Sequence, residues 1–273
     1  MEHGGPSRTA LVTAWARAVH QVADQPRILT DPLVARLVGS EAGAPGIDRP
    51  RRLFFAARAR FAEDRVAHAV ADGVRQAVFL GAGLDTFGCR NPYPDLRVFE
   101  VDHPATQEWK RERLALAGID CPATATFVPL DFETGTLAAA LAAAGFQRSE
   151  PAVFVWLGVV FYLTPAAARA TLDYIAGQAR PAEVVFDYLQ PADNDEERAH
   201  LRQRADRLAA EGEPLRSFFA PDEIAAQLRA LGFAEIDDYP AADLVAGYLD
   251  GQPGFEDEPS RALRASRVLR ARR

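Results

Sequence analysis

The chain has 273 residues, with 31 Lys and Arg against 38 Asp and Glu and a formal net charge of −7. This acidic balance gives the chain no general electrostatic surface for nucleic acid, and its longest apolar runs are too short to cross a bilayer. The start of the chain lacks the basic and apolar segments of a secretory signal, so we expect one cytoplasmic domain over residues 1–273.

Several kinds of catalytic site are excluded because the residues they need are scarce. Lys110 is the only lysine and follows Trp109, so there is no Gly-Lys-Ser/Thr phosphate loop, and we expect it on an exposed helix. The five histidines never pair at metal-ligand spacing, so we predict no metal site. Cys89 and Cys121 stand alone and are expected to be reduced and structural.

The first part of the chain is predicted to be helical. Apolar residues recur at helical spacing through residues 8–75, and a segment rich in Gly and Pro, residues 39–50, divides the region in two. The last helix is expected to stop at Asp72-Gly73. We therefore interpret residues 1–75 as a helical N-terminal cap.

Strands and helices then alternate. Five short apolar runs are predicted as buried strands, at residues 76–80, 96–101, 126–130, 152–156 and 183–186. Helical stretches lie between them, at residues 103–117, 137–144 and 165–178. This alternation predicts an α/β protein with a Rossmann-like parallel sheet covered by helices on both faces.

The remaining segments follow the sheet. We predict a charged helix over residues 193–211, a helix that begins at Pro221 and a strand near residues 233–237. Residues 190–218, joined through Gly212 and Pro214, are expected to act as a lid within a core of residues 76–273. Six arginines between Arg261 and Arg273 are interpreted as a solvated terminal face.

The first functional signal is a glycine loop after the first strand, at residues 81–86. Gly81 and Gly83 let the backbone turn tightly and approach a ligand, and Asp102, 19 residues beyond Gly83, ends the second strand. An acid there can accept the hydroxyl protons of an adenosine ribose. Thr86 replaces the third glycine of a dinucleotide loop, which favours a cofactor without phosphates, such as S-adenosylmethionine.

The third predicted strand ends in Asp131-Phe132. This pair offers a carboxylate for the adenine amino group and an aromatic face beside it. The alternative role for Asp131 is to cap the following helix.

At these residues the sequence resembles the leucine carboxyl methyltransferase superfamily, in particular its bacterial O-methyltransferases of the polyketide and actinobacterial type. The resemblance runs from near residue 9 to near residue 190, and its most specific stretches are Phe79-Leu80-Gly81-Ala82-Gly83-Leu84-Asp85-Thr86 and Phe99-Glu100-Val101-Asp102. It departs from the carboxyl methyltransferases proper at Leu157, where they carry an acid before the glycine that follows the fourth strand.

The resemblance implies a role for each of eight residues in binding S-adenosylmethionine. Arg58 would grip the cofactor carboxylate, with Arg17 as a second cation, because a planar guanidinium holds a carboxylate by two parallel bonds. Without the resemblance, Arg58 would more often be a solvent-facing helix residue. The others would back the methionine moiety (Gly81, Ala82, Gly83), hold the ribose (Asp102) and frame adenine (Asp131, Phe132). Glu100 is expected to point to the other side of its strand.

Catalytic candidates are fewer. A phenol or alcohol acceptor would benefit from a base within about 3 Å, whereas a carboxylate acceptor needs none. His103, Tyr162 and Tyr188 are candidates; the alternative roles are a helix-start cap for His103 and simple packing for Tyr162.

We therefore predict an S-adenosylmethionine-dependent O-methyltransferase of a small molecule, such as a secondary metabolite or carboxylic acid. The alternatives are a protein that binds the cofactor without methyl transfer and a nicotinamide-dependent oxidoreductase.

Overall fold

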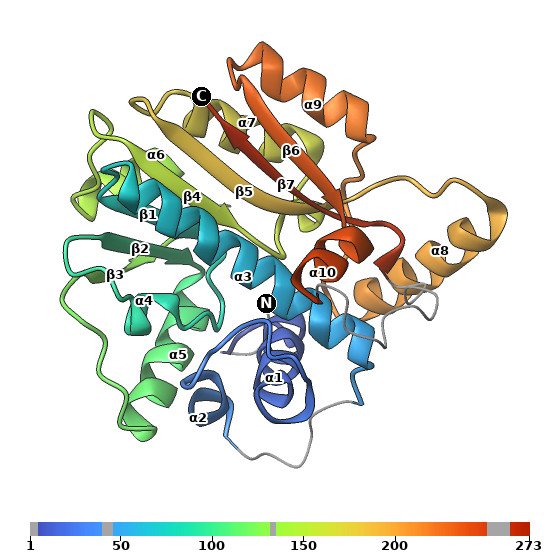
Figure 1. Cartoon of the computed structure of the whole chain (residues 1–273), viewed down its shortest axis with the longest axis horizontal. Helices are drawn as coiled ribbons and strands as arrows, with labels where there is room; N and C mark the ends of the chain where they lie inside the picture. The colour runs from blue at the N-terminus through green and yellow to red at the C-terminus, as the bar shows by residue number, and fades with distance from the viewer. Residues whose placement is uncertain (1–4, 40–45, 132–134, 250–262) are drawn as a thin grey trace.

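A seven-stranded sheet forms the centre of the computed structural model, which describes residues 5–39, 46–131, 135–249 and 263–273 (Figure 1). The strand order is β3-β2-β1-β4-β5-β7-β6. The bounds are β1 Gln76–Leu80, β2 Arg97–Asp102, β3 Ala125–Pro129, β4 Ala152–Trp156, β5 Ala182–Leu189, β6 Glu235–Pro240 and β7 Ser266–Arg272. Strands β1 to β5 pair in parallel, and β7 runs antiparallel to both β5 and β6. The predicted α/β class and Rossmann-like sheet are confirmed.

The strand order reverses beside β1, the place where open α/β sheets have their ligand-binding crevice. The chain runs outward from β1 through β2 to β3 and then returns to β4 on the other side of β1. The loops that follow β1 and β4 therefore meet at the carboxyl edge of the sheet, next to each other. Gly81 has φ of 63°, and a Cβ there would overlap the Val159 side chain of the loop after β4. Only glycine lets these two loops approach so closely.

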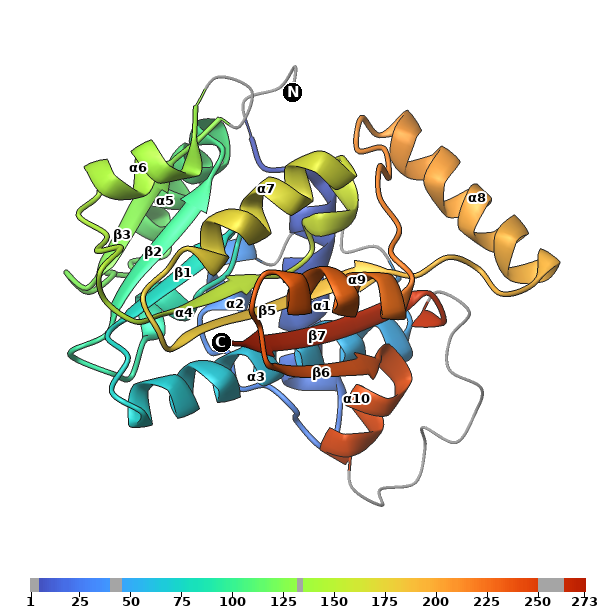
Figure 2. The same cartoon turned by 90° about the horizontal axis from the view of Figure 1, so that it is seen from above.

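Helices cover both faces of the sheet (Figure 2). One face packs against α6 Leu137–Ala143, α7 Pro165–Ala176 and α9 Pro221–Ala230, and the other against α3 Arg49–Ala71 and α10 Ala241–Leu249. Side chains of β1 alternate between the two, with Val78 and Leu80 in the first core and Ala77 and Phe79 in the second.

A third apolar cluster lies beside the glycine loop. It joins α1 Arg8–Ala23, α2 Val34–Val38 and α5 Pro104–Leu116. The remaining helices are α4 Phe87–Arg90, the 3₁₀ turn η1 Val160–Tyr162 and α8 Asp195–Ala210. The helices begin where the sequence provides caps: Ser7, Asp48 and Thr164 each accept a backbone N–H three residues on.

The C-terminal arginines do not form the solvated terminal face that the sequence predicted. Arg267, Arg270 and Arg272 belong to β7, which lies between β5 and β6 instead of forming a solvated face. Arg270 is 6% exposed and bonds Glu183 at 3.1 Å and Asp237 at 2.9 Å. The cations enter the sheet because neighbouring strands supply carboxylates for them. The helix α10 was not predicted.

Two further expectations are wrong. Cys89 and Cys121 form a disulfide between α4 and the segment before β3, although they were expected to be reduced. Lys110 is 1% exposed and not on a solvated face, because its ammonium group bonds the buried Glu100 carboxylate. Its burial follows from a charge partner on β2 that helix periodicity cannot reveal.

Among the described residues, no helix is both long enough and apolar enough to cross a membrane.

Candidate cofactor site

The carboxylate of Asp102 joins the end of β2 to the glycine loop. Its Oδ2 accepts the Gly83 N–H at 2.5 Å, and its Oδ1 accepts the His103 N–H at 2.7 Å. Burial raises the pKa of Asp102, and these two backbone donors oppose that effect. A carboxylate can accept about four hydrogen bonds, so the two oxygens can also accept hydrogen bonds from the hydroxyl groups of a ligand.

Glu100 has different partners. Its carboxylate bonds Lys110 and lies against Gly88 of α4, where a Cβ would come within 2.5 Å of Oε1. The expectation that Glu100 points to the other side of the strand is not supported, because residues two apart on a strand share a face; the two acids differ in their partners. Of the two acids at the end of β2, Asp102 is the one beside the glycine loop.

Arg17 supports the loop from the α1 side. Its Nη1 and Nη2 donate to Asp85 and Asp31, each at 2.7 Å. Asp31 also accepts the Thr86 hydroxyl at 2.7 Å. Burial would raise the pKa of Asp85, but Arg17 and Arg90 lower it to about 2. Arg17 therefore binds the far end of the loop, and contact with the cofactor stays a prediction for it.

Arg58 of α3 lies beside the loop after β4. Its Nη1 donates to Asp187 of β5, and the second oxygen of Asp187 accepts the Gly158 N–H at 2.5 Å. Gly158 has φ of 77°, and a Cβ there would stand 3.3 Å from Nη2 of Arg58. The missing side chain lets the guanidinium lie directly against the loop. The predicted fifth strand, residues 183–186, stops just before Asp187, and neither Asp187 nor Gly158 received a predicted role from the sequence.

The predicted adenine pair is only half described. Asp131 follows β3 and is partly buried, whereas Phe132 lies outside the described residues. The cap of α6 is supplied by Thr136, whose hydroxyl accepts the Ala139 N–H at 3.3 Å, so the alternative capping role for Asp131 is wrong.

The three catalytic candidates are not equivalent. His103 is the N-cap of α5, and its Nδ1 accepts the Ala105 N–H at 3.2 Å, which confirms its alternative role. Tyr188 is 1% exposed and donates to Asp238 at 2.6 Å, so it lies in the core and not at the crevice. Tyr162 is partly buried in η1, and burial raises its pKa, with an opposing contribution from the Thr9 hydroxyl. At neutral pH Tyr162 is therefore a hydrogen-bonding group and not a base.

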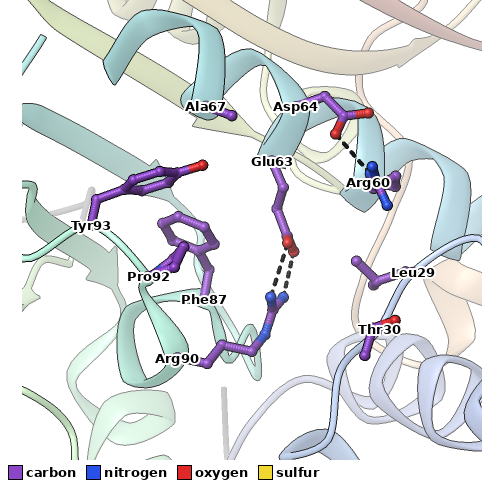
Figure 3. Close-up of a pocket in the computed structure, with 10 residues that line it drawn as sticks. All are labelled: Leu29, Thr30, Arg60, Glu63, Asp64, Ala67, Phe87, Arg90, Pro92 and Tyr93. Atoms are coloured by element: carbon purple, nitrogen blue, oxygen red, sulfur yellow. Dashed lines mark hydrogen bonds and ion pairs between the residues drawn. The ribbon is translucent and has the colours of Figure 1, made fainter. Parts of the chain in front are cut away.

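A cavity of about 260 Å³ lies elsewhere, between α3, α4 and the segment of Leu29 (Figure 3). Its charged side chains pair with one another, Glu63 with Arg90 and Asp64 with Arg60. None of the predicted cofactor residues lines it. Within the described ranges, no three His, Cys, Asp or Glu side chains are arranged to hold a metal ion.

Comparison with known proteins identifies the family. The model of the leucine carboxyl methyltransferase family matches residues 10–176. A Bacillus subtilis protein named "Putative S-adenosyl-L-methionine-dependent methyltransferase YktD" is 31% identical over 273 residues, covering 85% of this chain and 88% of its own. A Mycobacterium tuberculosis protein with the same descriptive name, Rv3787c, is 34% identical over 217 residues, covering 71% of this chain and 70% of its own.

The fold is shared with solved structures at low sequence identity. The crystal structure of a "putative methyltransferase" from Thermobifida fusca superposes with a TM-score of 0.63 at 16% identity and covers all of this chain and 96% of its own. The family match extends over all five parallel strands except β5 and includes the glycine loop, Asp102 and Arg58. The chain belongs to the leucine carboxyl methyltransferase family.

Proposed function

We propose that this protein is an S-adenosylmethionine-dependent O-methyltransferase that acts on a small molecule carrying a nucleophilic oxygen. The observation that carries the proposal is the contact of Asp102 with Gly83, which puts a carboxylate beside a glycine turn at the point where strand order reverses. The Bacillus subtilis and Mycobacterium tuberculosis relatives are both named S-adenosyl-L-methionine-dependent methyltransferases, which supports this cofactor.

The crevice suits such a cofactor at its two ends. Asp102 would accept the ribose hydroxyls, while Gly81, Ala82 and Gly83 give a backbone surface that a methionine chain can lie against. Arg58 would hold the cofactor carboxylate through Nη2, the amino group that faces the space a Cβ of Gly158 would fill. Asp187 orients the guanidinium for that contact by holding Nη1. Asp131 would bond the adenine amino group.

The chemistry asks little more of the protein than alignment. When bound, S-adenosylmethionine supplies a methyl group on a sulfonium, an excellent leaving group for direct displacement. Positioning an acceptor oxygen in line with that group supplies on the order of 7–11 kcal/mol of the barrier reduction. Tyr162, at the loop after β4, is the side chain best situated to donate a hydrogen bond to the acceptor, because its raised pKa keeps the hydroxyl protonated.

Isothermal calorimetry tests the cofactor. Wild-type protein should bind S-adenosylmethionine and its product S-adenosylhomocysteine, and Asp102→Ala should weaken both by about 10- to 100-fold, the loss of a charge-assisted hydrogen-bonding partner. Asp120→Ala, at an exposed acid in the same half of the chain, is the matched control and should bind like wild type.

Absence of binding to the wild-type protein would refute the proposal. Tight binding of NAD or NADP in its place would point to the oxidoreductase alternative. Binding of S-adenosylmethionine with no methyl transfer to any oxygen acceptor would point to a cofactor-binding protein without this activity.

A further inference from the structure

The glycine loop, residues 81–86, is anchored at both ends. At its start, the Gly81 and Ala82 N–H groups donate to one carbonyl of β2 at 2.8 and 3.1 Å. At its end, the Thr86 hydroxyl donates to the Asp31 carboxylate at 2.7 Å. Asp31 lies between α1 and α2, so the sheet holds one end of the loop and a segment of the N-terminal region holds the other.

Asp31 is itself tightly fixed. It is fully buried, and its Oδ2 accepts a hydrogen bond from Arg17 Nη2 at 2.7 Å. Its Oδ1 accepts the backbone N–H groups of Leu33 and Val34 at 3.2 and 3.1 Å, at the start of α2. With the bond from Thr86, these donors fill the roughly four hydrogen-bond positions of a carboxylate. The side chain therefore has a single orientation and is a rigid anchor for the loop.

The Thr86 hydroxyl has a partner on each side. It accepts the Arg90 Nε–H at 2.9 Å, and Arg90 pairs with Glu63 of α3 (Figure 3). A guanidinium can only donate and a carboxylate can only accept, so the hydroxyl accepts from Arg90 and donates to Asp31. Thr86 is fully buried, so solvent cannot replace either bond.

The position of Thr86 in the loop explains what these bonds can do. A dinucleotide loop has its third glycine here, which lets the following helix pack closely on the strand. In this chain the loop contains Gly81 and Gly83, whose backbone freedom would let the turn adopt several conformations. A side-chain bond at the end of the loop restricts that freedom before a ligand arrives, and such preorganisation reduces the entropy lost on binding.

We propose that Asp31 is a positioning residue for the cofactor, which acts through the Thr86 hydroxyl to hold the glycine loop in the conformation that binds S-adenosylmethionine. The inference rests on the proposed function and adds a role for the segment between α1 and α2: it sets the affinity for the cofactor without touching it. Asp31 has no exposed surface, so it acts on the cofactor only through the residues that it bonds.

Arg17 offers a second route from Asp31 to the cofactor, and the two routes have different consequences. Arg17 donates to Asp31 and Asp85 and is the predicted second cation for the cofactor carboxylate. If Asp31 acted by orienting Arg17, its loss would weaken the binding of only those ligands that carry the carboxylate. If Asp31 acts through Thr86 and the loop, the binding of every ligand that lies on the loop should weaken equally.

The test measures the binding of S-adenosylmethionine and of its decarboxylated form to the full chain by isothermal calorimetry. Thr86→Val keeps the shape of the side chain and removes the hydroxyl, so it should weaken the binding of both ligands alike, by about tenfold. Thr86→Ser retains the hydroxyl and should stay within about twofold of wild type. The matched control is Thr171→Val, which removes a hydroxyl bonded to the Ala167 carbonyl of α7 at 3.0 Å and should bind both ligands like wild type.

A double-mutant cycle tests whether Asp31 acts through Thr86. Asp31→Asn should also weaken the binding of both ligands. Because the two residues share one bond, the double variant should lose less affinity than the product of the two separate losses. A loss of stability alone would leave the dissociation constant of the folded protein unchanged, and the Thr86 variants carry the test if Asp31→Asn does not fold.

The outcomes separate this inference from the proposed function. If the wild type binds neither ligand, the proposed function is refuted and the inference with it. If the wild type binds both and Thr86→Val binds them equally well, or if Thr86→Ser is as weak as Thr86→Val, the inference alone is overturned. Losses confined to S-adenosylmethionine would assign the effect to Arg17, and losses that multiply in the double variant would mean that Asp31 and Thr86 act separately; either result also overturns the inference.

Discussion

Arg58 of α3 and Asp187 of β5 form an ion pair in which the two side chains are 7% and 3% exposed. The second carboxylate oxygen of Asp187 holds the Gly158 N–H after β4. One carboxylate thus joins a helix of the N-terminal region, the last parallel strand and a loop of the crevice. The Arg58 guanidinium also lies over the Phe55 ring, with 4.6 Å between its central carbon and the ring centre, a cation–π contact.

Replacing Asp187 with alanine should be strongly destabilising, because it leaves a buried cation and a backbone N–H without their acceptor. We expect a loss of about 3–5 kcal/mol in the free energy of unfolding, measured in urea. The matched control is Asp173→Ala, which breaks the exposed pair with Arg169 and should cost about 0.3–0.5 kcal/mol. Equal losses in the two variants would mean that the Asp187 contacts stabilise the protein no more than an exposed ion pair does.

Gly81→Ala should damage both stability and cofactor binding. An alanine at this position must keep the positive φ of the backbone, and its Cβ must displace the Val159 side chain. Gly73→Ala is the control, because its φ of 91° imposes similar strain while nothing lies within 4 Å of the added Cβ. We expect Gly73→Ala to lose about 1–2 kcal/mol with unchanged binding of S-adenosylhomocysteine.

The Gly81 variant should lose more than Gly73→Ala and bind the cofactor product at least about tenfold more weakly. Adding Val159→Ala to Gly81→Ala should recover part of both losses, since it removes the overlapping atoms. If the two single variants behave alike, the approach of the loops after β1 and β4 has no part in binding.

Local sequence was enough to predict the glycine loop and its acid. Gly81, Gly83 and Asp102 each stand directly at the end of an apolar run, and parallel strands bring such ends to one edge. The strands β1 and β4 were predicted with their observed bounds. Both are buried at every position, so each appears in the sequence as an uninterrupted run of residues suited to the core.

Contacts between distant segments could not be predicted in this way. The arginines of β7 resemble a solvated tail until Glu183 and Asp237 are known to flank them. Likewise, α8 is so rich in charge that its sequence does not show which face of the helix packs against the protein, the face that carries Leu208. Within this C-terminal segment the apolar pair Val268-Leu269 favours a strand. The arginines on either side, Arg267 and Arg270, made the segment look like a charged surface instead.

Lys110 should be protected from amine-reactive reagents in the native protein. It is 1% exposed and bonded to Glu100, so acetylation requires local or global opening. Treatment with an N-hydroxysuccinimide ester at neutral pH, followed by mass spectrometry of the peptide containing residue 110, should find modification in urea-unfolded protein and almost none in native protein. Rapid, complete acetylation of the native chain would show that the helix α5 does not bury this side chain.

His20 should make the protein less stable in mild acid. Its side chain is fully buried, with Nδ1 placed 3.1 Å from Asp24 and Nε2 accepting the Ile28 N–H at 3.1 Å. An imidazole that accepts at Nε2 is neutral, and it can donate to Asp24 only from Nδ1. Burial lowers the pKa of His20 below its ordinary value of 6.5, although Asp24 opposes the shift.

The direction of the effect follows from proton binding. Above pH 6.5 the histidine is neutral in both states, so its contribution is fully present; as the pH falls below that value the unfolded chain takes up a proton that the folded chain does not. The free energy of unfolding should then decline, by at most about 1.4 kcal/mol per pH unit from this group. Urea unfolding of wild type and His20→Gln between about pH 8 and pH 5 isolates the effect, because carboxyl groups titrate in both. The two curves should converge as the pH falls, whereas parallel curves would mean that His20 binds its proton equally well in the folded and unfolded chains.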